Sequence, residues 1–180
     1  MDLQHITLGG GCFWCLEAVY ELVDGVVAVE SGYSNGHVAD PGYEAVCTGT
    51  TGHAEVVRVD FDAARVSLRE LLEIFFVIHD PTTRDRQGND VGPQYRSAIY
   101  WHEAAQETVV REVVAELNAA LADTGRRAVT ELAPVANYWP AEAEHRRYFA
   151  RHPQAGYCAY VVAPKVAKFK RSFAARVRRG

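Results

Sequence analysis

Apolar and charged residues alternate along residues 54–61 in the clearest strand pattern of the sequence. Val57, Val59 and Phe61 lie two positions apart, with charged residues between them, so they share one face of the strand. Counting back by twos places Glu55 on the same face. The pattern therefore predicts a strand that carries one carboxyl group into apolar surroundings.

Residues 68–78 have apolar side chains three and four positions apart, which predicts a helix with one buried face. Pro81 lies just beyond its end, and proline disfavours helical geometry in the residue before it. The same criteria predict further strands at 3–8, 26–29, 97–101 and 129–132 and further helices at 13–23, 103–121, 141–151 and 164–180.

Strands and helices are mixed along the chain without a regular strand–helix alternation. This order favours an α+β two-layer sandwich over a doubly wound parallel sheet. We expect a mixed, ferredoxin-like central sheet flanked by helices and long loops. Because 180 residues is near the commonest size of one domain, a single domain is expected over residues 1–180.

Composition excludes several classes of protein. Hydrophobic residues make up 48% and charged residues 23%, which is typical of a globular domain and not of a disordered chain. The net charge of −4 gives no overall attraction for nucleic acid or anionic lipid. The basic run in the last helix is interpreted as a solvated face; it consists of Lys165, Lys168, Lys170, Arg171, Arg176, Arg178 and Arg179.

The start of the chain lacks the pattern of a secretion signal, and no apolar stretch approaches the length of a membrane span. We therefore expect a cytoplasmic protein. Cysteines are normally kept reduced in that compartment, so the four cysteines are expected to be catalytic, redox-active or metal-binding and not structural bridges.

Cys12 is the strongest candidate for chemistry, because it lies between three glycines and a predicted helix. Free backbone N–H groups at a helix start point toward such a side chain, and the helix dipole favours a thiolate there. We therefore expect Cys12 to have a lowered pKa and to be nucleophilic. The alternative is a buried, inert cysteine.

Cys15 completes a Cys-x-x-Cys pair with Cys12, a spacing found in redox pairs and in halves of zinc sites. Cys47 and Cys158 form no second short-spaced pair, which disfavours a four-sulfur zinc site. The two large aromatics between Cys12 and Cys15 are unusual for a thioredoxin-like motif. A general disulfide oxidoreductase and a zinc-binding structural module remain as alternatives.

Two further features add to the chemistry around Cys12. Phe13 and Trp14 would form an apolar wall beside its sulfur, suited to a methyl or thioether group, although both side chains alternatively pack into the core. Glu55, on the apolar face of its strand, is expected to have a raised pKa and to stay protonated near pH 7. The alternative for Glu55 is a solvated position at a frayed strand end.

The sequence from Gly11 to Cys15 resembles the signature of type A peptide methionine sulfoxide reductases, which reduce the S epimer of the sulfoxide. Further segments resemble the same family in the expected order and extend the match over nearly the whole chain: 31–34, 43–47, 51–56, 79–83, 87–97, 156–158 and 164–165. Pro93 departs from the family pattern, which generally has threonine there. This departure affects the loop that carries Asp90 and Tyr95.

The resemblance implies thiol-dependent reduction of methionine-S-sulfoxide, protein-bound or free, without a cofactor or metal. Cys12 would attack the sulfur, and Glu55 would supply the proton that the leaving oxygen needs. Tyr43 and Tyr95 match positions that hydrogen-bond the sulfoxide oxygen, and Asp90 matches a residue that positions the substrate or a water molecule. The product on the enzyme would be a sulfenic acid at Cys12.

By the same resemblance, Cys158 resolves this sulfenic acid as a disulfide with Cys12, which thioredoxin then opens. A flexible segment around 152–160 would carry Cys158 toward Cys12. Cys15 is nearer in sequence, but helix geometry directs its side chain away from Cys12 unless the first turn unwinds. Cys47 is expected to be a buried apolar thiol. We expect a monomer with no nucleic-acid or membrane partner.

Overall fold

The computed structural model describes residues 1–180 and contains a six-stranded sheet in the order β7-β6-β1-β3-β2-β8. The four inner strands β6, β1, β3 and β2 pair with one another in antiparallel fashion, and the parallel pair of β6 and β7 makes the sheet mixed. The strands are β1 Leu3–Gly9, β2 Val26–Ser34, β3 Ala54–Asp62, β6 Ala98–Trp101, β7 Glu131–Pro134 and β8 Trp139–Pro140.

Helix α1 (Phe13–Tyr20) connects β1 to β2, and helix α3 (Leu68–Ile78) connects β3 to β6. The resulting order β-α-β-β-α-β, with the inner strands arranged β6-β1-β3-β2, is that of a ferredoxin-like unit. The expected α+β sandwich with a mixed, ferredoxin-like sheet is therefore confirmed.

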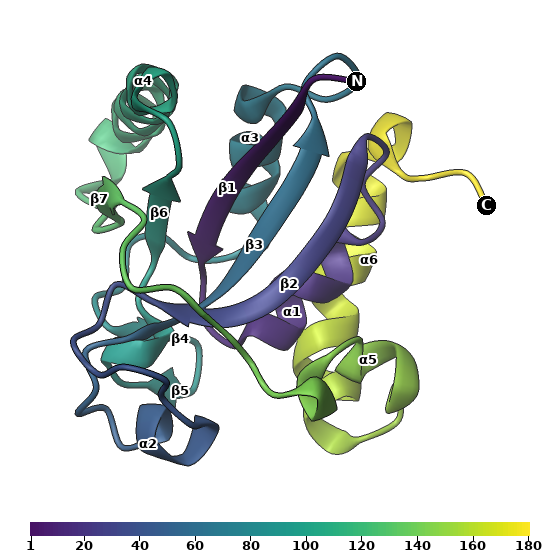
Figure 1. Cartoon of the computed structure of the whole chain (residues 1–180). Coiled ribbons are helices and arrows are strands. Elements are labelled where there is room, and N and C mark those ends of the chain that lie inside the picture. Colours follow the sequence, from purple (N-terminus) through teal and green to yellow (C-terminus); the bar gives the residue numbers. More distant parts are fainter.

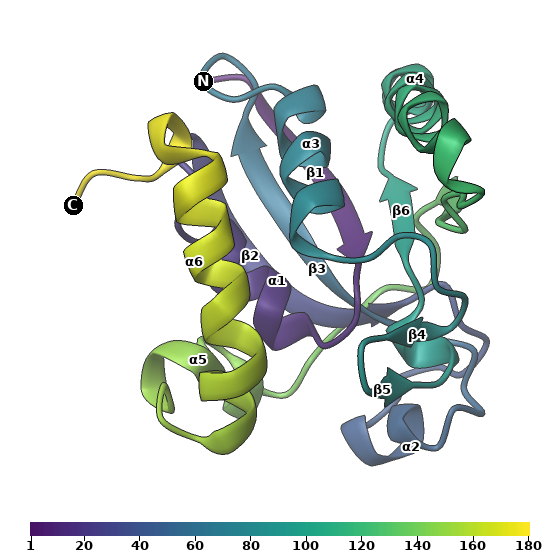
Figure 2. The same ribbon diagram turned by 180° about the vertical axis from the view of Figure 1, so that it is seen from behind.

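Helices α1, α3 and α6 (Ala163–Ser172) cover one face of the sheet, and α4 (Ala104–Leu121) packs against α3 and β6 (Figure 2). Val57, Val59 and Phe61 of β3 are fully buried on this helix-covered face. The opposite face has a small apolar cluster that includes Val56, onto which Val135 packs. None of the helices has the length and apolar character needed to cross a membrane.

Short elements gather at one end of the sheet, close to the start of α1 (Figure 1). They are α2 Tyr43–Cys47, the hairpin strands β4 Arg86–Gln87 and β5 Asp90–Val91, and a 3₁₀ helix Pro93–Tyr95. Pro93 occupies the first position of this 3₁₀ helix, where its fixed φ and missing N–H are tolerated. The departure from the family pattern is thus accommodated within a regular turn.

Several expected elements differ from the structure: the first helix ends at Tyr20 and not at Val23, and the strand expected at 129–132 spans Glu131–Pro134. Strand β2 continues to Ser34, because its pairing with β3 extends to Ala54. The expected helix 141–151 is wrong: a 3₁₀ turn Ala143–His145 and a short helix α5, Tyr148–Arg151, replace it. Arg147 separates the two with a left-handed φ of 50°, which a continuous right-handed helix does not allow.

The basic C-terminal run is also organised differently from the expected helix 164–180. A π-helical segment, Cys158–Val162, leads into α6, which ends at Ser172. Beyond it, the Arg178 N–H donates to the Leu22 carbonyl oxygen at 2.7 Å, and Arg176 forms an ion pair with Glu70. Part of the basic run therefore binds the body of the protein.

Ser67 forms a capping box at the start of α3. Its hydroxyl accepts from the Glu70 N–H at 3.1 Å, and its own N–H donates to the Glu70 carboxylate at 2.9 Å. We predict that Ser67→Ala lowers the free energy of unfolding by about 1 kcal/mol, because one N–H at the helix start loses its acceptor. Urea denaturation measures this loss. Ser172→Ala, at an exposed serine without this role, is the control, and an equal effect of both variants would contradict the prediction.

Candidate active site

Cys12 lies at the N-cap of α1, with φ −60° and ψ 128°, and 9% of its surface is exposed. Gly11, immediately before it, has a φ of +90°, and a Cβ atom there would lie 2.8 Å from the Gln87 side chain. Only glycine satisfies both conditions. The glycine run therefore allows a close turn that places the thiol at the helix start.

The first N–H groups of α1 are shared between Cys12 and Glu55. The Phe13 N–H donates to the Glu55 carboxyl oxygen Oε1 at 3.2 Å, across a separation of 42 residues in sequence. The Trp14 N–H is directed to the Cys12 thiol, where it lowers the thiol pKa. One helix end thus holds an acid and a thiol side by side.

The expectation of an acidic Cys12 thiol is wrong for the unliganded protein. Burial raises its pKa well above the usual value, and the nearby groups Glu55, Cys15 and Asp90 raise it further. The Trp14 N–H lowers it, as the helix-start argument requires, but this effect is the smaller one. The resting thiol is therefore protonated at neutral pH.

Glu55 lies on the helix-covered face of β3, as the alternation predicts, and only 1% of its surface is exposed. Burial raises its pKa to about 8, while the hydrogen bond from Phe13 lowers it and the negative charge of Asp90 raises it. The carboxyl group therefore carries a proton at pH 7.

Tyr43, Tyr95 and Asp90 lie on three of the short elements at the end of the sheet. Burial raises the pKa of both phenols, and the charges of Glu55 and Cys12 act on both in the same direction. Asp90 in turn affects Glu55 and Cys12. The structure thus brings all five of these predicted residues into one electrostatic neighbourhood.

The two aromatics after Cys12 take different positions. Phe13 is fully buried and packs against Tyr33, with ring centroids 5.7 Å apart. Trp14 stacks on Tyr148 at 3.8 Å and donates its indole N–H to His145 Nδ1 at 3.3 Å. Trp14 also lines a cavity of about 350 Å³ together with Tyr43, whereas the Phe13 ring belongs to the core.

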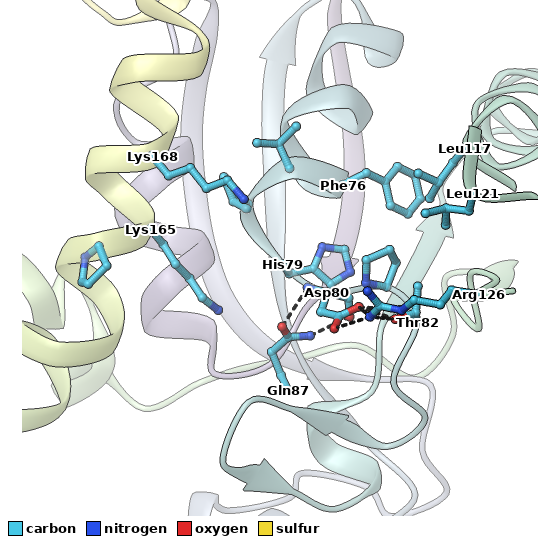
Figure 3. A pocket seen from close by; sticks show the side chains of 14 residues that line it. Phe76, His79, Asp80, Thr82, Gln87, Leu117, Leu121, Arg126, Lys165 and Lys168 are labelled. Carbon is cyan, nitrogen blue, oxygen red and sulfur yellow. Dashed lines mark hydrogen bonds and ion pairs between the residues drawn. The ribbon is translucent and has the colours of Figure 1, made fainter. Parts of the chain in front are cut away.

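A second cavity, of about 310 Å³, lies beside Asp90, Tyr157 and Lys165. The Tyr157 hydroxyl donates to the Asp90 carboxylate at 2.6 Å. A larger cavity of about 600 Å³ lies between α3, α4 and α6, and none of the predicted site residues lines it (Figure 3). Of the predicted site residues, Trp14 and Tyr43 line the first of the two smaller cavities and Asp90 lines the second, whereas Cys12 and Glu55 line neither.

All four cysteines are free thiols. Cys158 is fully buried at the start of the π-helical segment and belongs to the same apolar cluster as Cys12 and Cys15. Cys47 is exposed at the end of α2, so its expected burial is wrong. Its helix is a single short turn at the surface, in which only Val46 is buried.

The sequence interpretation gave no role to several side chains around the site. Tyr33 lies directly opposite Glu55 in the β2–β3 register, and its hydroxyl donates to Glu142 Oε1 at 2.9 Å. Glu142 Oε2 accepts from the Tyr43 N–H at 3.1 Å. Alternation places Tyr33 beside Glu55 only once the register is known, and no local pattern indicates the contact with Glu142.

Glu142, Glu144 and His145 place potential metal-ligand atoms within 4.8 Å of one another. The Glu142 carboxylate and His145 Nδ1 already have partners within the protein, whereas His145 Nε2 is buried without one. His145 Nδ1 accepts from the Trp14 indole, and the Glu142 carboxylate accepts from Tyr33 and Tyr43. The arrangement therefore serves to orient the aromatic side chains near Cys12.

Known proteins resemble this chain over nearly its whole length. A family model described as peptide methionine sulfoxide reductase matches residues 4–177. The chain is 55% identical over 173 residues to peptide methionine sulfoxide reductase MsrA of Polynucleobacter asymbioticus, covering 95% of this chain and 90% of that protein. It is 52% identical to the MsrA of Saccharolobus solfataricus, covering 98% of each chain.

Solved structures agree with the sequence comparison. The reduced form of Mxr1 from Saccharomyces cerevisiae superposes with a TM-score of 0.81 at 36% identity, covering 87% of this chain and 90% of that one. Mxr1 in complex with Trx2 superposes with a TM-score of 0.57 at 29% identity, covering 82% and 85%. The chain belongs to the peptide methionine sulfoxide reductase family.

Proposed function

We propose that this enzyme reduces methionine-S-sulfoxide, free or in proteins, to methionine, with Cys12 as nucleophile and Glu55 as acid. The observation that carries the proposal is the pairing of a buried, protonated carboxyl with a thiol at one helix start. Oxide is a very poor leaving group, so sulfoxide reduction needs a proton donor beside the nucleophile.

The first step transfers the oxygen atom from the substrate to Cys12. The Cys12 sulfur forms a bond to oxygen as the sulfur–oxygen bond of the substrate breaks, which yields methionine and a sulfenic acid. Glu55 delivers a proton to this oxygen and takes up the proton that the Cys12 thiol loses, so the step involves no net gain or loss of protons. Tyr43 and Tyr95 remain protonated because their pKa values are raised, so they are able to donate hydrogen bonds where negative charge develops on oxygen.

Protonation of Glu55 also favours the thiolate form of Cys12. The negative charge of Glu55 is the second largest cause of the raised Cys12 pKa, and the neutral carboxyl lacks that charge. The hydrogen bond from the Trp14 N–H then lowers the Cys12 pKa without the opposing effect of the Glu55 charge. We propose that Trp14 forms the apolar wall for the substrate methyl group and that Asp90 positions the substrate or a water molecule.

Regeneration requires a second thiol, for which we propose Cys158. Disulfide formation releases the oxygen as water and leaves an oxidised enzyme, which thioredoxin reduces by thiol exchange. The structure of Mxr1 in complex with Trx2 supports thioredoxin as the reductant. We propose that residues 152–160 move to bring Cys158 to its partner, within a single catalytic domain of residues 1–180.

We further propose that the enzyme acts as a monomer in the cytoplasm. The four free thiols suit a reducing compartment, where thioredoxin is maintained in its dithiol form. The proposed steps use only side chains of this chain and an external dithiol.

The stereochemical prediction is tested with the separate S and R epimers of a blocked methionine sulfoxide. We expect the S epimer alone to be consumed, with either dithiothreitol or the thioredoxin system as reductant, and Cys12→Ser to abolish turnover. Equal consumption of R would refute the stereochemical assignment. Reduction of insulin disulfides without sulfoxide turnover would instead favour a general disulfide oxidoreductase, and loss of the fold with a chelator would favour a zinc module.

We predict that Glu55→Gln slows the first chemical step by about 10²- to 10⁴-fold, because an amide does not deliver the proton. Single-turnover formation of methionine, followed by rapid quench, measures this step. Glu17→Gln is the matched control. Glu17, on α1, is likewise a buried carboxyl, but it accepts a hydrogen bond from the Ser31 hydroxyl and not from the Phe13 N–H. Equal rates for Glu55→Gln and wild type would remove Glu55 as the acid.

The buried proton on Glu55 also predicts a pH dependence of stability. Its pKa is about 8 in the folded protein and about 4.5 in the unfolded chain, so the folded state holds the proton more tightly. The resulting stability is fully present below pH 4.5 and is lost as pH rises through 8, by about 5 kcal/mol in total. Glu55→Gln lacks this loss.

Urea denaturation of wild type and Glu55→Gln at pH 5 and pH 8.5 measures this difference. We expect the variant to gain stability relative to wild type at the higher pH. A difference between the two proteins that does not change with pH would show that Glu55 is ionised and solvated in the folded state.

A further inference from the structure

We propose that the cavity between α3, α4 and α6 binds a small organic anion with an apolar chain. The carboxylate of this ligand lies between Lys165 and Lys168, on one side of the cavity. Its chain lies against Phe76, Leu117 and Leu121 on the other side. The volume of about 600 Å³ is within the range of pockets that hold small ligands. None of the residues assigned to sulfoxide reduction lines this cavity, so the proposal is independent of the proposed function.

The apolar wall of the cavity consists of side chains that the core leaves partly exposed. Helix α4 carries apolar residues along one face, but Leu117 and Leu121 near its end are only half-buried. The two leucines are four residues apart and therefore share one face of the helix. Phe76 of α3 is also half-buried and lies beside them in the cavity (Figure 3). A ligand chain that removes this apolar surface from water is stabilised by doing so.

Two cations from α6 face the cavity from the side opposite this wall. Figure 3 shows the Lys165 and Lys168 side chains directed into the cavity from the helix across from Phe76. The two lysines are three residues apart on α6, so their Cβ atoms lie about 5–6 Å from each other. Neither ammonium group has an ion-pair partner within the protein.

Asp80 is the only carboxylate that lines the cavity, and its charge is already paired. It forms an ion pair with Arg126 at 3.0 Å and accepts from the Thr82 hydroxyl at 2.6 Å. The charges of Lys165 and Lys168 therefore remain uncompensated. A ligand that complements the cavity is negatively charged at the end that meets the lysines.

The neutral polar side chains that line the cavity are also satisfied. Gln87 donates to the Asp80 carbonyl oxygen at 2.9 Å and accepts from the Asp80 N–H at 2.8 Å. The two ring nitrogens of His79 contact the Phe75 carbonyl oxygen and the Ser97 hydroxyl. Burial lowers the pKa of His79 to about 4, so its ring adds no charge at pH 7. The cavity therefore favours a ligand bound through charge and apolar contact over a sugar or an extended peptide, which need many hydrogen bonds.

A carboxylate on an aliphatic or aromatic chain has the chemistry that this cavity selects. Its two oxygens are able to accept from the ammonium groups of Lys165 and Lys168 at the same time. Inorganic phosphate would contact the lysines but would leave the apolar wall in water. A neutral hydrocarbon would cover the wall but would leave both lysine charges uncompensated. Medium-chain carboxylates such as octanoate combine both contacts in one molecule.

The experiment titrates octanoate, 1-octanol and octylammonium, which have the same chain length, into the full-length protein at neutral pH by isothermal titration calorimetry. We expect octanoate to bind most tightly and octylammonium least, because only the charge of the head group differs. High salt should weaken the binding of octanoate by screening and leave that of octanol unchanged. Hexanoate should bind about 10- to 20-fold more weakly than octanoate, since each buried methylene contributes about fourfold.

Variants locate the binding site within the molecule. Lys168→Gln should weaken octanoate binding about fivefold and leave octanol binding unchanged. Lys170→Gln, on the same helix but outside the cavity, is its control. Leu121→Glu should weaken octanoate binding about tenfold or more, because it places a carboxylate in the apolar wall. Ala120→Glu adds the same charge at the neighbouring exposed position and should bind octanoate like wild type.

Several results would overturn the proposal. They are no binding of octanoate, equal affinity for octanoate and octylammonium, and an octanoate affinity that neither Lys168→Gln nor Leu121→Glu changes. Displacement of octanoate by methionine-S-sulfoxide in Cys12→Ser would place it at the substrate site instead. Binding of an acidic peptide without binding of octanoate, or dimerisation that Leu121→Glu abolishes, would assign the cavity to a protein partner. Because all of these are binding measurements, none depends on sulfoxide turnover.

Discussion

The hydrogen bond from the Phe13 N–H to the Glu55 carboxyl is the contact on which the arrangement of the site depends. It joins the start of α1 to the start of β3 and fixes an acid beside the thiol of Cys12. A buried carboxyl without such a donor is costly. Here one donor from the helix end satisfies it, while burial keeps the proton on it at pH 7.

The same burial explains why the thiol is not acidic at rest. Glycines and a helix start are local features, so the sequence predicts the position of Cys12 and the donors that face it. The pKa of the thiol depends instead mainly on burial and on the charges of Glu55 and Asp90, which tertiary contacts bring close. Sequence reasoning therefore predicted the position of the Cys12 thiol at the helix start but gave the wrong direction for its pKa.

Elements with strong internal patterns were predictable, and those defined by contacts were not. The helix Leu68–Ile78 was predicted with its observed ends, because its apolar spacing and its proline stop act locally. Residues 141–151 have polar helical character, yet Arg147 adopts a left-handed angle and the segment packs as two turns. In α4, apolar residues continue along one helix face as far as Leu121. Of these apolar side chains, only Val110 and Val113 are buried.

The Asp90–Tyr157 hydrogen bond connects strand β5 to the segment that carries Cys158. Tyr157 therefore holds the Asp90 carboxylate, whose charge acts on Glu55, and it directly precedes Cys158 in the chain. When Cys158 moves to form a disulfide, its direct neighbour Tyr157 must move as well. The proposed movement of residues 152–160 would therefore break the hydrogen bond from Tyr157 to Asp90, which would couple the proposed regeneration step to the loop beside Glu55.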